Sequence, residues 1–221
     1  TAFLQESLTF FRSHGHRPKT ITTDREWVFK HCETILAAEE VTFRYTSPGA
    51  KAAIVERSIR TIKDRTRASY HALPHPLPAR YIPALVLDVA QIHQFLPNKK
   101  SIQHNSASPY TIITGNYDVA LRLQQLVDLG IGSLASFTLP APTHTSSTIH
   151  LPRTEQGFVI NRHATGPYTY DVYFPSLFRS HTVSNYHPVT DPDPQVLSLW
   201  KGLHDADRNS NPNTTPDLTP F

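Results

Sequence analysis

The chain has 221 residues and a mass of 24.9 kDa, with 21 Lys and Arg, 18 Asp and Glu, one Cys and no Met. No stretch approaches the roughly 18 unbroken apolar residues of a membrane-spanning helix, so we expect no integral membrane protein. The single Cys32 excludes a disulfide framework and a paired-thiolate zinc site, and it fits a reducing intracellular compartment. Because the chain begins at Thr1 and lacks Met, we expect a fragment.

Charge is unevenly distributed along the chain. Residues 1–70 carry 12 Lys and Arg against 8 Asp and Glu, whereas residues 191–221 carry 2 against 5. A basic front part suggests an anionic partner, although ordinary surface variation gives the same imbalance.

Helical and strand patterns alternate over the first seventy residues. Apolar residues at helical spacing predict helices, and short β-branched or alternating runs predict strands. In chain order these criteria predict a helix at 2–13, a strand at 19–24, a helix at 26–39, a strand at 41–45 and a helix at 52–70. This alternation is typical of an α/β protein.

The rest of the chain changes character twice. An apolar helical run ends near Leu96, with Pro83 in its first turn, and Ser108 opens a short helix that Gly115 can cap. Short alternating segments over 157–189 predict a small antiparallel barrel or sheet. The Asp-, Pro- and Asn-rich end predicts disorder.

The predicted order of strands and helices makes two carboxylates candidate metal ligands. Asp24 ends the first predicted strand, and Glu56 lies on the long helix after the second. Converging carboxylates bind Mg²⁺, which keeps part of its water shell for substrate phosphates. The simpler alternatives are that Asp24 caps the helix after it and that Glu56 is a surface acid paired with Arg60.

The long helix carries a row of cations after Glu56. Arg60, Lys63 and Arg67 share the face of Glu56, and Arg57 and Lys51 lie nearby. Such a face can place a phosphodiester beside a metal, because the cations hold backbone phosphates. The alternative is a solvated amphipathic helix. The opposite face is assigned to the core and comprises Val55, Ile59, Ile62 and Thr66.

These segments resemble a known family. Residues 22–26 (TTDRE) and 55–63 (VERSIRTIK) resemble the second and third acidic motifs of a retroviral-type integrase, most closely that of a copia-like retrotransposon polyprotein. Residues 108–115 (SPYTIITG) are similar to the segment that closes the catalytic region in copia-like elements. Residues 157–159 and 170–173 resemble the SH3-like barrel that follows it, so the resemblance covers most of 1–190.

The resemblance implies a ribonuclease-H-like α/β core, here truncated on its N-terminal side, followed by a small SH3-like β-barrel. It implies three acids that hold two Mg²⁺ or Mn²⁺ ions and join element DNA ends to target DNA, with Asp24 as the second acid and Glu56 as the third. Arg60 and Lys63 match positions that contact DNA in the family. A nuclear site of action and a homo-oligomer are also implied.

The expected domain boundaries combine the resemblance, which gives the core and the SH3-like part, with the polar composition that predicts the linker and the tail. They are a partial catalytic core at 1–140, a linker at 141–151, an SH3-like domain at 152–190 and a disordered tail at 191–221.

The sequence departs from the family in four ways, the first being that Asp24 and Glu56 are a few residues closer in sequence than is usual. Residues 1–23 contain no Asp, so the first acid is missing and this chain alone is expected to lack a complete active site. His14, His16, His31 and Cys32 do not reproduce the spacing of the family's zinc domain. The loop at 47–51 lacks the Asn-Gly pair that often precedes the Glu helix.

Three hypotheses remain open at this point. The first is the remainder of a metal-dependent integrase, and the second is a non-catalytic nucleic-acid-binding relic of one. The third is a structural or protein-interaction domain in which Asp24 and Glu56 are a helix cap and a surface acid.

Overall fold

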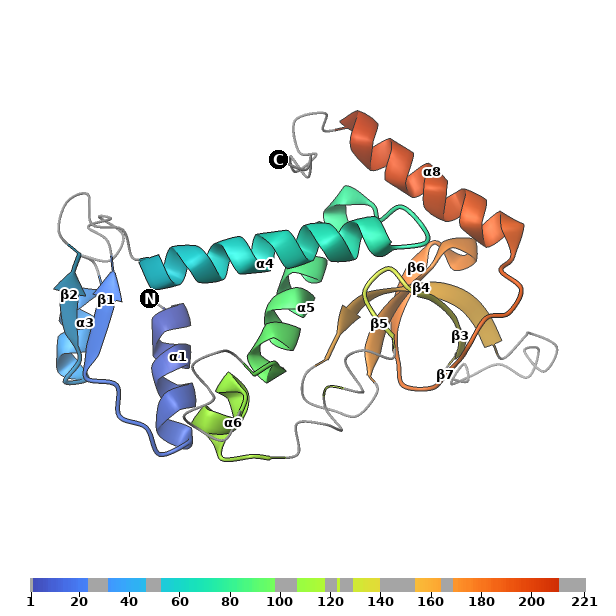
Figure 1. The fold of residues 1–221 in the computed structure, drawn as a ribbon. Coiled ribbons are helices and arrows are strands. Elements are labelled where there is room, and N and C mark those ends of the chain that lie inside the picture. The colour runs from blue at the N-terminus through green and yellow to red at the C-terminus, as the bar shows by residue number, and fades with distance from the viewer. Residues whose placement is uncertain are drawn as a thin grey trace. The chain divides into compact units, whose positions relative to one another are not determined.

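The computed structural model describes residues 2–23, 32–46, 53–97, 107–117, 123, 129–139, 154–163 and 169–210. The chain forms two compact units (Figure 1). The first unit comprises 1–61 and 94–119, and the second comprises 62–93 and 120–221. Within the described ranges, no helix has the length and apolar character needed to cross a membrane.

The first unit is built on two parallel strands. Helix α1 (Ala2–Ser13) precedes β1 (Thr20–Thr23), and α3 (Glu33–Ala38) precedes β2 (Thr42–Tyr45). β1 pairs in parallel with β2, from Thr20 opposite Thr42 to Thr23 opposite Tyr45. Parallel pairing requires a crossover connection, and α3 lies in the segment that makes it.

A small apolar cluster holds this unit together. Leu8 from α1, Leu36 from α3 and Val41 before β2 are almost fully buried, together with Cys32. Alternation along β1 and β2 turns Ile21 and Phe43 toward the same cluster.

Helix α6 (Pro109–Thr114) also belongs to the first unit, and its ends confirm the predicted caps. The Ser108 side chain accepts a hydrogen bond from the Thr111 N–H, and Pro109 occupies the first turn. Gly115 ends the helix with a φ of +69°, a left-handed conformation that glycine adopts without a Cβ clash.

The second unit contains an antiparallel sheet. Its five strands are β3 (Leu134–Thr138), β4 (Thr154–Arg162), β5 (Tyr170–Phe174), β6 (Arg179–Val183) and β7 (Tyr186–His187). They lie in the order β6-β5-β4-β3-β7, and each strand pairs antiparallel with its neighbours. Along β3 and β5, buried side chains alternate with more exposed ones, so one face of the sheet is turned to the core.

Three helices pack with this sheet around one core. They are the C-terminal part of α4 (Ala53–Ala72), α5 (Ile82–Phe95) and α8 (Pro194–Ser210). Trp200 of α8 stacks on Phe158 of β4, with ring centroids 4.1 Å apart, and on Tyr81, with centroids 5.7 Å apart. Trp200 is 1% exposed, so α8 is an integral part of the core.

The structure confirms the prediction of a mixed α/β protein. It confirms the strands within 19–24 and 41–45 and the antiparallel segments within 157–189, as well as the helices at 2–13, near 52–70 and ending near 96. Only residues 32–39 of the helix expected at 26–39 can be compared, because 24–31 lie outside the described residues, and α3 occupies 33–38 of them.

Two expected boundaries are corrected. β3, within the region assigned to the catalytic core at 1–140, pairs with β4 in the sheet expected at 152–190. Residues 194–210 form α8 and not a disordered tail, because Val196 and Trp200 supply enough apolar surface to dock a helix. The expected linker at 141–151 lies outside the described residues.

Candidate nucleic-acid interface on helix α4

Helix α4 is the longest helix that the structure describes, with 20 residues. It contains neither Gly nor Pro, and Glu56 in its first turn complements the positive end of the helix dipole. It carries five Lys and Arg against two acids, so its local charge is positive. This excess exceeds that of the whole chain per residue and makes the helix the first candidate for binding an anion.

The C-terminal half of α4 is anchored on one side. Thr66 is 5% exposed, and its hydroxyl donates to the Ile62 carbonyl oxygen at 2.8 Å. Ile62 and Tyr70 pack against the core of the second unit. These contacts fix the rotation of the helix about its axis.

A polar contact adds to this anchor. Arg65 Nη1 lies 2.9 Å from His93 Nδ1 of α5. Burial lowers the pKa of His93, and the neighbouring Arg65 charge lowers it further. The neutral imidazole can therefore accept the guanidinium hydrogen bond, which ties α4 to α5.

The opposite side of α4 presents charged groups to solvent. Glu56, Arg57, Arg60 and Lys63 are all exposed, and within the described ranges none of the four forms a hydrogen bond or ion pair through its side chain. Arg60 and Lys63 follow Glu56 by one and two turns. Their charges are therefore available to an external anion.

Arg67 is less available than the sequence suggests. Its side chain is 25% exposed, and Nη1 lies 3.6 Å from the Asp64 carboxylate one turn earlier. We therefore place the strongest part of the basic face at Arg57, Arg60 and Lys63.

The apolar side of α4 requires a correction. Ile62 and Thr66 belong to the core as expected, but Val55 is 53% exposed and Ile59 is 48% exposed. The predicted stripe of four therefore buries only its C-terminal half. Periodicity identifies the stripe, but a neighbouring element must be present at each turn to cover it.

Two predicted site residues cannot be placed. Asp24 and Lys51 lie outside the described residues, so the expected approach of Asp24 to Glu56 remains a prediction. Among the residues that are described, no group of three or more His, Cys, Asp or Glu side chains is arranged to hold a metal ion. His16, one of the four residues compared with a zinc motif, instead contacts the Ile113 carbonyl oxygen through Nε2 at 2.7 Å.

The structure reveals a second group of charges that was not predicted. Arg12, Arg17 and Lys19 line a pocket in the first unit together with Glu39 and Glu40. The sequence shows three cations between positions 12 and 19, which could have indicated this group. The acids that face them come from a later segment, so the pocket itself has no local pattern.

No protein-family model matches this chain, and no curated protein matches its sequence.

Proposed function

We propose that this chain is part of a retrotransposon-type integrase and that helix α4 binds the phosphate backbone of DNA. The observation that carries the proposal is the exposed face of α4, on which Glu56 is followed by Arg60 and Lys63. Phosphate contacts of this kind position a protein on DNA without reading its sequence.

The anchoring of α4 supports this role. Arg65 and Thr66 hold the opposite side of the C-terminal half of the helix through His93 and the core, so Lys63 projects from a fixed support. A fixed row loses less conformational entropy on binding than a flexible tail.

The arrangement before α4 also agrees with the proposal. Parallel β1 and β2 are joined through α3, as expected for part of a ribonuclease-H-like core, and Asp24 follows the last residue of β1 in the sequence. The five-stranded antiparallel sheet is the element that we assign to the SH3-like part. Since the sheet shares a core with α5, we treat the two as one unit.

The proposed reaction uses Mg²⁺ or Mn²⁺, which would activate the attacking oxygen and stabilise the leaving one. Glu56 suits this role because its carboxylate is exposed and has no partner among the residues described. Asp24 would supply the second oxygen ligand, and the cations after Glu56 would hold the phosphodiester nearby.

A DNA titration tests the binding step. We compare the wild type with the double variant Arg60→Ala/Lys63→Ala on a labelled duplex by fluorescence anisotropy at several NaCl concentrations. If each residue contacts one phosphate, the slope of log K against log salt becomes shallower by about 0.9 per residue. The matched control is Arg179→Ala/Lys201→Ala, which removes two exposed cations from β6 and α8. An equal change in both variants would contradict a specific role for α4.

A second measurement separates catalysis from binding alone. Isothermal titration of Mn²⁺ into the wild type and Glu56→Gln should show weaker binding in the variant, because the amide is a poorer ligand than a carboxylate. DNA binding that requires Arg60 and Lys63, combined with Mn²⁺ binding that does not require Glu56, would favour the non-catalytic relic. If Arg60→Ala/Lys63→Ala leaves DNA binding unchanged and Glu56→Gln leaves Mn²⁺ binding unchanged, the structural or protein-interaction hypothesis is favoured.

A further inference from the structure

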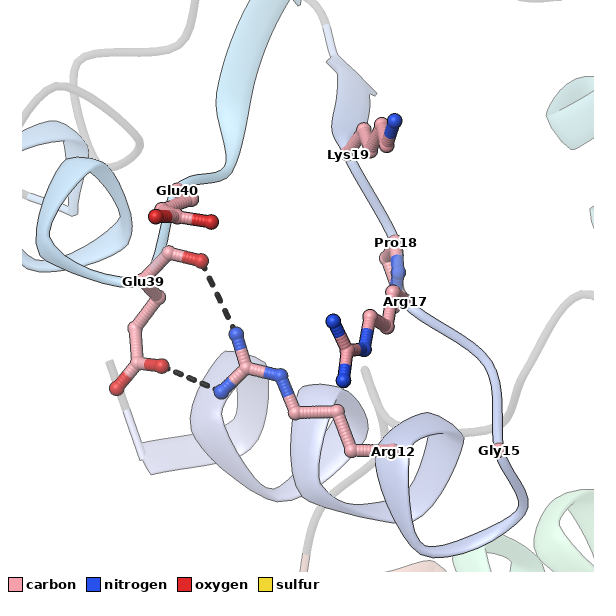
Figure 2. Close-up of a pocket in the computed structure, with 7 residues that line it drawn as sticks. All are labelled: Arg12, Gly15, Arg17, Pro18, Lys19, Glu39 and Glu40. Carbon is pink, nitrogen blue, oxygen red and sulfur yellow. Dashed lines mark hydrogen bonds and ion pairs between the residues drawn. The ribbon is translucent and has the colours of Figure 1, made fainter.

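A pocket of about 750 Å³ lies within the first unit, beside the C-terminal end of α1. Figure 2 shows Arg17, Pro18 and Lys19 on one wall and Glu39 and Glu40 on the opposite wall, with Arg12 reaching up from α1 between them. The volume falls in the range of small-ligand sites in proteins.

Arg12 is already neutralised in this pocket. It donates through Nη1 to the Glu39 carboxylate and through Nη2 to the Glu39 carbonyl oxygen at 3.0 Å. Glu39 is the C-cap of α3, so Arg12 places a positive charge at the negative end of the helix dipole. The pair therefore forms a fixed floor of the pocket.

Arg17 is not neutralised in this way. Its side chain is exposed and forms no hydrogen bond or ion pair with any residue that the structure describes. In Figure 2 its guanidinium extends from its wall toward Arg12, whereas the Lys19 ammonium points to the other side. An exposed guanidinium without a carboxylate partner keeps its N–H donors available to an external anion, and a phosphate matches their fork geometry.

Glu40 has an unusual backbone at the same opening. Its φ is +59°, in the left-handed region, and it follows the helix cap where glycine is normally found. The Glu40 N–H donates to the Ala37 carbonyl oxygen at 3.1 Å, and the Val41 N–H donates to that of Leu36 at 2.9 Å. These two bonds form a Schellman motif, which holds Glu40 in the left-handed conformation despite its side chain.

We propose that this pocket binds a phosphate group through Arg17, with the Arg12–Glu39 pair as its floor and Glu40 as a carboxylate that weakens the binding. This inference rests on the proposed function in so far as the phosphate belongs to a DNA strand. Free phosphate presents the same chemistry, and the experiment below distinguishes the two sources.

The first arm measures DNA binding by salt-dependent anisotropy, as for α4. Arg17→Ala should make the log–log slope shallower by about 0.9, while Glu40→Gln should bind more tightly at every salt concentration because a repelling charge is removed. The charge-matched control Lys201→Ala, on α8, should leave the slope unchanged. Arg17 is exposed, so its replacement should leave the fold intact, which the circular dichroism spectrum and melting temperature check.

The second arm uses inorganic phosphate as the probe. In ¹⁵N-labelled wild-type protein, phosphate should shift the Arg17 Nε–Hε signal, which is assigned by its absence in Arg17→Lys, more than an equal ionic strength of chloride does. A shift without any DNA binding would support the pocket as a free-phosphate site and contradict the proposed function. DNA binding that depends on Arg60 and Lys63, without a shift and without an effect of Arg17→Ala, would overturn the pocket alone.

Discussion

Asp88 of α5 and Arg162, the last residue of β4, form an ion pair inside the second unit. The two side chains are 7% and 5% exposed, and Arg162 Nε donates to Asp88 Oδ1 at 2.6 Å. Nη2 of the same guanidinium donates to the same oxygen. The pair fixes α5 to the sheet across 74 positions of sequence, in a core that is built mainly of aliphatic and aromatic side chains.

Removing one partner of this pair should be costly. Arg162→Met leaves the Asp88 carboxylate buried and unpaired, so the free energy of unfolding should fall by about 3–5 kcal/mol. The double variant Asp88→Leu/Arg162→Met, which removes both charges, should recover most of that loss. Urea denaturation at pH 7 measures both. A single variant as stable as the wild type would show that the pair does not hold α5.

The loss of stability in Arg162→Met should also depend on pH. Burial raises the pKa of Asp88, and Arg162 opposes that rise. Since the folded pKa lies above the unfolded one, protonation of Asp88 stabilises the fold at low pH, and this contribution is lost as the pH rises through the folded pKa. Without Arg162 the pKa rises further. Arg162→Met should therefore lose less stability near pH 4 than near pH 8, provided that the wild type is still folded at both.

Asp207 of α8 titrates in the opposite direction. A hydrogen bond from Arg80 lowers its pKa below the ordinary value of 3.8. The folded pKa is below the unfolded one, so the stabilisation is present above the ordinary value and is lost as the pH falls through the folded pKa. Because the Arg80 side chain is 51% exposed, Asp207→Asn should cost only about 0.5–1 kcal/mol at pH 7. The difference from the wild type, measured by thermal melts, should vanish below the folded pKa.

Glu40 should be replaceable by glycine with a gain in stability. Its left-handed backbone disfavours any residue with a Cβ, so Glu40→Gly should stabilise the protein by about 1 kcal/mol. Glu39 has a φ of −95° and pairs with Arg12, so Glu39→Gly should instead destabilise it. Denaturation midpoints at unchanged slope measure both effects. A loss of stability in Glu40→Gly would show that the Glu40 side chain makes a contact that outweighs its strain.

Gly157 should tolerate no side chain at all. A Cβ there would lie 2.5 Å from Val172 Cγ1 and 2.9 Å from the Tyr173 carbonyl oxygen on the neighbouring strand. Gly157→Ala should therefore cost about 1–3 kcal/mol, since β4 and β5 must move apart. Gly202→Ala is the matched control: it lies in α8 with nothing within 4 Å, so it should raise stability by up to about 1 kcal/mol. These values follow from urea denaturation.

Local sequence patterns predicted those helices and strands that depend on only a few neighbouring residues. Ser108 and Gly115 identified both ends of α6, because capping depends on one side chain and one left-handed residue. The alternation at 41–45 and the helical spacing at 2–13 were sufficient for β2 and α1. The cations at Arg60 and Lys63 were identified in the same way, since positions one or two turns apart share a face.

Long-range packing decided the rest. The polar composition of 191–221 predicted disorder, but one well-placed Trp200 docks α8 through its stack on Phe158. Val55 and Ile59 match a buried stripe in sequence, but they are exposed because burial requires a covering neighbour as well as a period. No local sequence pattern predicts the Asp88–Arg162 pair or the position of Arg17 opposite Glu40. Each consists of residues that are distant in sequence and that only the folded chain brings together.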